Sequence, residues 1–101
     1  MPESLIASIV ATYDPRRIIL FGSAARGEAG PERDLDLLVM IDDDRPDASL
    51  NRRQRHEARR GYDGAVDIIP YREGKFLRRA RASGTFAHMI MTEGVTVYER
   101  R

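Results

Sequence analysis

The sequence predicts an α+β fold in which a short mixed sheet is flanked by helices. Three observations support this class. Apolar residues recur at helical spacing near both ends of the chain, apolar runs of strand length lie between them, and turn-forming residues separate the two kinds of segment. Because 101 residues suffice for one domain and leave no room for a second, we expect a single domain over residues 1–101.

The first half of the chain is predicted to form one helix and two strands. Between Leu5 and Tyr13 the apolar residues repeat every three or four positions, so they share one face of a helix that must end at Asp14-Pro15. Residues 17–21 are predicted to form a short buried strand, closed by Gly22-Ser23. Segment 34–41 carries the apolar residues of a central strand.

The second half alternates helices with short strands. Residues 48–60 have helical character but few apolar positions, so this helix should lie exposed or against a partner. A third strand over 65–69 should stop at Pro70, and the next helix should turn Phe76, Leu77 and Ala80 inward. Residues 83–85 break that helix. Phe86, Met89 and Ile90 line a last helix that is capped at Gly94, and 95–98 should add an edge strand.

Composition excludes several classes of protein. Hydrophobic residues make up 42% and charged residues 33%, which fits a globular protein and argues against disorder. No apolar run approaches the roughly 18 residues of a membrane span. The chain has no cysteine, hence no disulfide or thiolate metal site, and its first residues lack the features of a secretion signal. We therefore expect a cytoplasmic protein without a membrane anchor.

The net charge of +1 conceals a division of charge along the chain. Residues 1–50 hold five Arg and ten acidic residues, whereas residues 51–101 hold twelve basic and six acidic ones. Opposite charges within one domain indicate an acidic cluster and a basic surface with different roles. Few aromatic residues interleave with the arginines of segment 52–60, so we expect this basic segment to contact an acidic patch on a partner rather than nucleic acid.

Three aspartates are the candidate metal ligands. Because side chains alternate along a strand, Asp34 and Asp36 point to one face, about 6.6–7 Å apart. Two like charges on an apolar strand require a cation or solvent, and a wet strand start is the alternative. Asp67 lies in a third apolar run and also needs a partner; a water-facing edge strand or an ion pair with Arg would serve as well. Carboxylate oxygens suit Mg²⁺ or Mn²⁺.

The Gly22-Ser23 turn is a candidate phosphate site. It follows a strand and precedes a predicted helix start, where backbone N–H groups and the Ser23 hydroxyl can donate to a phosphate. Arg26, one helical turn further on, could reach the same phosphates. The alternative is a plain strand-to-helix turn with Ser23 as N-cap. The Gly-Lys-Ser/Thr ending of a Walker loop is missing.

Together these motifs resemble the nucleotidyltransferase superfamily that includes polymerase beta. The resemblance rests on their order and spacing: Gly22-Ser23, then ten residues, then Asp34-Leu35-Asp36, and Asp67 on a later strand. The short chain and the stretch from Phe21 to Gly27 resemble, more narrowly, the minimal nucleotidyltransferases that act as antitoxins of HEPN toxins. The likeness extends over nearly the whole chain and implies a small polymerase-beta-like nucleotidyltransferase fold.

The resemblance also implies a reaction and a set of roles. Asp34 and Asp36 would hold two Mg²⁺ ions, and Asp67 would complete one ion site and help to deprotonate the acceptor hydroxyl. Gly22 and Ser23 would hold the terminal phosphates of ATP. The expected reaction is transfer of AMP to a tyrosine hydroxyl of a cognate HEPN RNase toxin, which is thereby neutralised. Transfer to a small molecule, and neutralisation of the toxin by binding alone, remain the alternatives.

Overall fold

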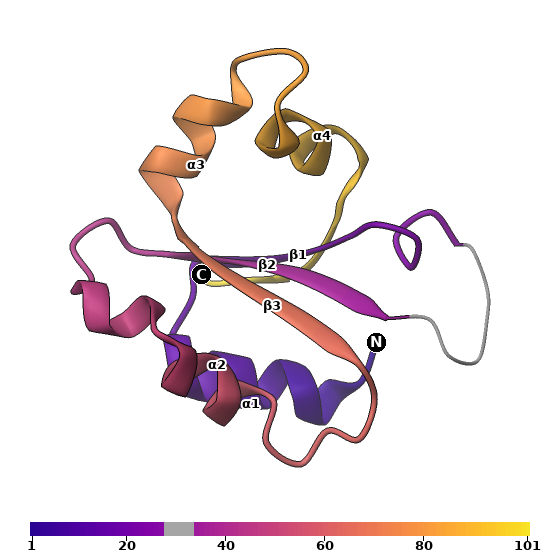
Figure 1. The fold of residues 1–101 in the computed structure, drawn as a ribbon, viewed down its shortest axis with the longest axis vertical. Coiled ribbons are helices and arrows are strands. Elements are labelled where there is room, and N and C mark those ends of the chain that lie inside the picture. Colours follow the sequence, from indigo (N-terminus) through magenta and orange to yellow (C-terminus); the bar gives the residue numbers. More distant parts are fainter. Residues whose placement is uncertain (28–33) are drawn as a thin grey trace.

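The computed structural model describes residues 1–27 and 34–101 of the chain (Figure 1). Its helices and strands alternate in the manner expected of an α+β protein. In chain order the elements are α1 (Glu3–Tyr13), β1 (Arg17–Phe21), β2 (Leu35–Ile41), the 3₁₀ helix η1 (Asp47–Leu50), α2 (Arg52–Ala58), β3 (Val66–Arg72), α3 (Glu73–Ala80), α4 (Phe86–Glu93) and β4 (Val95–Glu99).

The strands form one mixed sheet in the order β3-β2-β1-β4. β1 pairs antiparallel with both β2 and β4, whereas β2 and β3 are parallel. A parallel pair needs a crossover connection, and η1 with α2 supplies it. The predicted fold class is confirmed, because helices flank a short sheet that contains both kinds of pairing.

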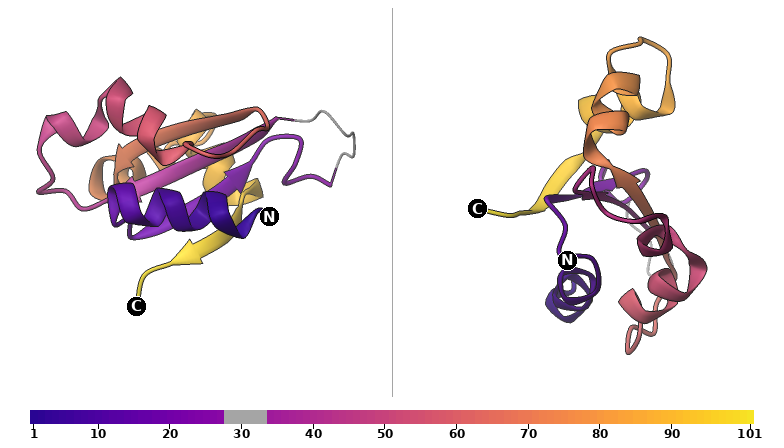
Figure 2. Two further views of the ribbon diagram at one scale, coloured as in Figure 1. Left: turned by 90° about the horizontal axis from the view of Figure 1, so that it is seen from below. Right: turned by 90° about the vertical axis from the view of Figure 1, so that its left-hand side faces the viewer.

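Helices cover both faces of the sheet. α1 and α2 lie on one face and α3 and α4 on the other, as Figure 1 and the turned views of Figure 2 agree. Each pair of helices packs on its face of the sheet and covers a separate hydrophobic core. The α1/α2 core is built on Leu5, Ile9, Tyr13, Ile18, Leu35, Leu37, Val39, Ile41, Ala58 and Ile68. The α3/α4 core is built on Ile19, Phe21, Leu38, Met40, Phe76, Ala87 and Ile90.

The first helix ends where the sequence predicts. α1 stops at Tyr13, and Asp14 adopts a left-handed conformation with φ 45° before the buried Pro15. The Asp14 N–H donates to the Val10 carbonyl at 2.8 Å, which satisfies one of the last carbonyl groups of the helix. Arg45, from the loop after β2, donates to the Tyr13 carbonyl. The chain therefore turns tightly into β1.

The helix expected over residues 48–60 is interrupted. Asn51 ends η1 and caps α2, because its side-chain oxygen accepts a hydrogen bond from the Gln54 N–H at 3.0 Å. α2 packs on α1 through Ala58, which is fully buried. Most other residues of α2 are exposed, in line with their polar character. The segment thus has a contact within the chain that its few apolar positions did not reveal.

The strand expected over 65–69 was predicted too short. β3 continues through Pro70 to Arg72, in register with β2 up to the pair of Arg72 with Ile41. β3 is the last strand at its side of the sheet, and an edge position tolerates the missing N–H of proline. Within residues 1–27 and 34–101, no helix combines the length and apolarity that a membrane crossing requires.

Candidate functional site

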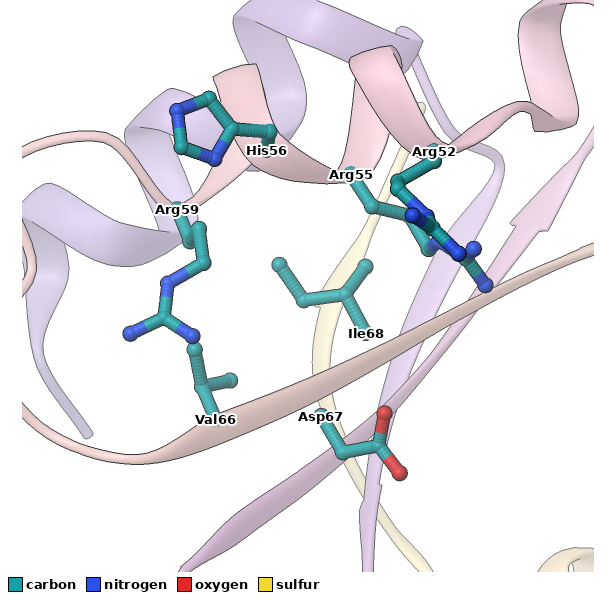
Figure 3. Close-up of a pocket in the computed structure, with 7 residues that line it drawn as sticks. All are labelled: Arg52, Arg55, His56, Arg59, Val66, Asp67 and Ile68. Carbon is teal, nitrogen blue, oxygen red and sulfur yellow. The ribbon is translucent and has the colours of Figure 1, made fainter.

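Asp36 and Asp67 lie side by side at the start of the parallel strand pair. They are register partners between β2 and β3. Their neighbours Leu37 and Ile68 are buried in the α1/α2 core, so alternation directs both aspartates to the other face of the sheet. Figure 3 shows the Asp67 side chain leaving β3 on the side opposite to Val66 and Ile68. Asp36 is half-buried and Asp67 is exposed.

Asp34 is the third carboxylate at this end of the strands, and we call Asp34, Asp36 and Asp67 the acidic group. Asp34 directly precedes β2 and is exposed. Burial raises the pKa of the Asp36 carboxyl, and the negative charges of Asp67 and then Asp34 raise it further. The three carboxylates therefore act on one another electrostatically. Asp67 faces water on an edge strand, which was one of the alternatives to a metal ligand in the sequence analysis. It is also the register partner of Asp36.

The acidic group is not a preformed metal centre. Among the described residues, no three His, Cys, Asp or Glu side chains come together as ligands of one ion. The acids nevertheless suit a divalent cation, because they offer hard oxygen donors and because their mutual repulsion and partial burial would be relieved by positive charge. Mg²⁺ or Mn²⁺ therefore fits the chemistry of Asp34, Asp36 and Asp67.

The Gly22 backbone lies against the Asp36 carboxylate. Phe21, which precedes it, is the register partner of Asp36. A Cβ atom on Gly22 would fall 2.5 Å from Oδ2 of Asp36, and the φ of Gly22 is +77°. Both the close approach and the left-handed backbone require glycine at this position.

Residues 22–27 form a hydrogen-bonded turn. The Gly22 carbonyl accepts from the N–H groups of Ala25 and Arg26 at 3.1 and 3.2 Å. The predicted helix start is therefore wrong for the described part of this segment, because Gly27 with φ +74° leaves the helical conformation after one turn. Ser23 is half-buried on the turn and Arg26 is exposed. The turn brings both residues to the end of β1, beside Asp36.

An aromatic pocket adjoins the acidic group, and the sequence did not reveal it. A cavity of about 180 Å³ opens on the α3/α4 face and is lined by Leu38, Ile69, Tyr71, Phe76, Arg79, Thr85, Phe86 and Ala87. Leu38 follows Asp36 by two residues and Ile69 follows Asp67 by two, so the pocket begins about 7 Å along the strands from the acids.

Phe86 is the residue of this pocket that was assigned to the wrong surface. The sequence predicts it on the inner stripe of the last helix, yet Ala87 and Ile90 are the buried residues of α4, and Phe86 is 55% exposed. Its ring meets Phe21 edge-on, with centroids 5.4 Å apart and planes at 85°. Spacing alone gives no signal for this, because Phe86 lies four residues before Ile90 and belongs to the same stripe; Phe86 is, however, the first residue of the helix.

The chain is similar to known proteins in both sequence and structure. A family model described as "Polymerase beta, Nucleotidyltransferase" matches residues 4–101. Among curated proteins, no sequence matches the chain. A solved structure of a putative nucleotidyltransferase from Sulfolobus solfataricus superimposes with a TM-score of 0.60 at 21% identity, over 96% of this chain and 76% of that one.

Two other similar structures are toxin–antitoxin proteins. One, solved with AMP-PNP, has a TM-score of 0.64 at 19% identity. The other is the toxin–antitoxin MntA-HpeT, with a TM-score of 0.62 at 16% identity, as a mutant in which two aspartates on either side of a single residue are replaced by glutamate. Both superpositions cover 100% of this chain and 76% of the other chain. At such identities the likeness shows a shared fold.

Proposed function

This chain belongs to the polymerase beta nucleotidyltransferase family, and we propose that it is an antitoxin that transfers AMP from ATP to a tyrosine hydroxyl of a HEPN RNase toxin. The observation that carries the proposal is the register pair of Asp36 and Asp67 beside Gly22. It joins a potential cation site to a turn that can accept phosphates, which is the combination that nucleotide transfer needs.

The toxin–antitoxin neighbours support the choice of acceptor. One of them was solved with AMP-PNP, an analogue of ATP, and the mutated aspartates of the other have the same spacing as Asp34 and Asp36. These properties belong to those proteins and suggest the substrate and the partner here.

Each residue has a proposed part in the reaction. The tyrosine oxygen attacks the α-phosphorus of ATP, the bond from that phosphorus to the bridging oxygen breaks, and pyrophosphate leaves. Asp67, the exposed carboxylate, takes the phenolic proton. Asp34, Asp36 and Asp67 would hold Mg²⁺, which when bound supplies charge stabilisation to the attacking and leaving oxygens.

The turn and the aromatic pocket would hold the nucleotide. The Gly22 backbone and the Ser23 hydroxyl donate to the phosphates, and Arg26 on the same turn neutralises their charge. The pocket under Phe86 receives the base. At about 180 Å³ it is smaller than the roughly 300 Å³ at which whole-ligand sites begin, so it suits one ring system rather than a complete nucleotide.

Transfer of radiolabel from ATP tests the proposal. Purified protein, Mg²⁺ and ATP labelled at the α-phosphate are incubated with the proposed HEPN partner, which is to be sought in the adjacent gene. Label on its tyrosine is measured by gel and mass spectrometry. Asp36→Asn should abolish labelling. Asp44→Asn, at an exposed aspartate just beyond β2, should not.

Other outcomes would reassign the function. Label that appears on metabolites in a small-molecule panel, and not on protein, would identify a small-molecule acceptor. Toxin that is neutralised equally by the parent chain and by Asp36→Asn, without label, would identify an antitoxin that acts by binding alone.

A further inference from the structure

The crossover between the parallel strands carries a dense positive charge. Over residues 52–60 there is a single acid, Glu57, and five arginines: Arg52, Arg53, Arg55, Arg59 and Arg60. Glu57 pairs with Arg60 at 3.6 Å. Among the residues that the structure describes, no carboxylate pairs with Arg52 or Arg55, and both are exposed. Their charge is available to a ligand from outside.

These arginines border a cleft with an aliphatic floor. The cleft has a volume of about 240 Å³ and lies between α2 and β3, lined by Arg52, Arg55, His56, Arg59, Val66, Asp67 and Ile68. Figure 3 shows the arginines Arg52, Arg55 and Arg59 extending toward β3, where Val66 and Ile68 face them. Arg59 is fixed in place, because it donates to the Gly64 carbonyl at 3.1 Å. We call this feature the arginine cleft.

The arginine cleft and the acidic group share one strand. Asp67 leaves β3 on the side away from the arginines, while Val66 and Ile68 face them (Figure 3). β3 is also the outermost strand on its side of the sheet. A protein whose hydroxyl group approaches Asp67 therefore has to lie along this edge, and its neighbouring surface would reach around β3 to the arginines.

We propose that the arginine cleft binds an acidic protein segment that also carries an apolar side chain. Carboxylates of the segment would pair with Arg52 and Arg55, and the apolar side chain would rest on Val66 and Ile68. The identification of that segment with the toxin rests on the proposed function; the chemistry of the cleft does not. Single-stranded nucleic acid fits less well, because none of the described residues that line the cleft is a Phe, Tyr or Trp that could stack strongly with a base.

Binding to defined polymers tests this inference in the absence of nucleotide and metal. The probes are a labelled copolymer of glutamate and leucine, and a labelled poly(U) RNA of matched charge, followed by fluorescence anisotropy at physiological salt. The full chain should bind the peptide. Arg52→Glu with Arg55→Glu should weaken binding about tenfold or more, because like charges repel at the cleft.

A matched pair of charge reversals is the control. Arg78→Glu with Arg81→Glu changes the net charge equally at exposed positions of α3 and the turn after it, away from the cleft. This variant should bind the peptide like the parent. Equal losses of peptide binding in both double variants would show that only net charge matters and would overturn the inference. Tighter binding of RNA than of peptide, or no binding of the peptide, would also overturn it.

The result is separable from the proposed transfer reaction. Asp36→Asn should bind the peptide like the parent, because Asp36 lies on β2 and is not among the residues that line the arginine cleft. Specific peptide binding without any AMP transfer would therefore leave the arginine cleft standing and remove the proposed function. AMP transfer to the toxin that survives Arg52→Glu with Arg55→Glu at unchanged toxin affinity would leave the proposed function standing and would show that the toxin does not bind in the arginine cleft.

Discussion

Gly22 and Asp36 are in contact across β1 and β2, with no room for a Cβ atom between the Gly22 backbone and Oδ2 of Asp36. This contact ties the proposed phosphate turn to the proposed metal ligand. A side chain at Gly22 would push the carboxylate aside more readily than it would move the strands, because the obstructing atom is the end of a side chain.

Gly22→Ala should therefore affect the chemistry more than the fold. The left-handed backbone costs about 1–2 kcal/mol for alanine, and the contact with Asp36 displaces the carboxylate. Gly27→Ala is the matched control, since its φ is +74° but no described atom lies within 4 Å of a Cβ placed there. Urea unfolding should give comparable losses for the two variants, whereas AMP transfer should fail only for Gly22→Ala. Equal transfer rates would show that the contact has no role.

Neutralising Asp36 should stabilise the protein in the absence of metal. The ionised carboxylate is half-buried and is repelled by Asp67 and Asp34. Asp36→Asn should raise the Tm in EDTA by a few degrees and should remove the further increase that Mg²⁺ gives the parent. Asp44→Asn is the control and should leave both values unchanged. A lower Tm in EDTA for Asp36→Asn would contradict the electrostatic interpretation.

Phe86 should contribute to nucleotide affinity and little to stability. Its ring is 55% exposed and contacts Phe21 at the mouth of the pocket. Phe86→Ala should raise the KM for ATP about tenfold, which corresponds to about 1.4 kcal/mol and lies within the roughly 1–3 kcal/mol expected for stacking with a base, while kcat changes less. Leu77→Ala, at a position of α3 that is 36% exposed, is the matched loss of an apolar side chain. An unchanged KM would show that the base of ATP does not bind in this pocket.

The Tyr13 hydroxyl destabilises the folded state. It is buried and has no hydrogen-bond partner among the described residues. Tyr13→Phe should increase the free energy of unfolding by about 1 kcal/mol, as expected when an unsatisfied polar group is removed. Burial raises the pKa of Tyr13 from 10.0 to about 12, so the parent should lose stability between these pH values, where only the unfolded chain releases the proton. Tyr13→Phe should lose less over the same range.

The Asp42 carboxylate should stabilise the folded state at neutral pH, and this stabilisation should be lost in acid. Arg100 Nη2 donates to both of its carboxylate oxygens, at 2.9 and 3.2 Å, and these bonds, with one from Arg16, lower the pKa of Asp42 below 3.8. A lowered carboxyl pKa stabilises the fold above the ordinary value, and this stabilisation is lost as the pH falls below it.

Asp42→Asn should accordingly be less stable than the parent at pH 7, and the difference should shrink as the pH is lowered below 3.8. Asp47→Asn is the comparison, because its side chain is 94% exposed although it pairs with Arg72 at 2.6 Å. Exposed pairs contribute only about 0–1 kcal/mol. Urea unfolding across this pH range gives the free energy of unfolding of the parent and of both variants. A difference between the parent and Asp42→Asn that stays the same at every pH would refute the expectation.

The sequence predicts correctly those elements that depend on interactions between residues close together in the chain. The stripe of α1, its end at Asp14 and the apolar run of β2 depend on near neighbours in sequence, and the structure confirms them. Other predictions were wrong. β3 continues through Pro70 because the strand is at an edge, and Asn51 interrupts the 48–60 helix with its own cap. The turn after Gly22 ends its helical conformation at Gly27, Leu77 is 36% exposed although it was predicted to face inward, and Phe86 is 55% exposed while its ring contacts Phe21.

The candidate site shows the same division. Sequence motifs singled out the three aspartates and the turn, but neither the register of Asp36 with Asp67 nor the contact of Gly22 with Asp36 is encoded locally. Both depend on how strands distant in sequence align. The pocket under Phe86 was missed for a related reason, since its walls come from β2, β3, α3 and α4 together.

The parallel pairing of β2 with β3 also bears on the order of folding. Asp36 and Asp67 are 31 residues apart in sequence and meet only after the crossover through α2 has closed. Such non-local contacts pay the entropy of loop closure before they gain stability, so they form slowly. We therefore expect the two aspartates to come together late in folding, and any fragment that lacks β3 to keep the Gly22 turn without a working acidic group.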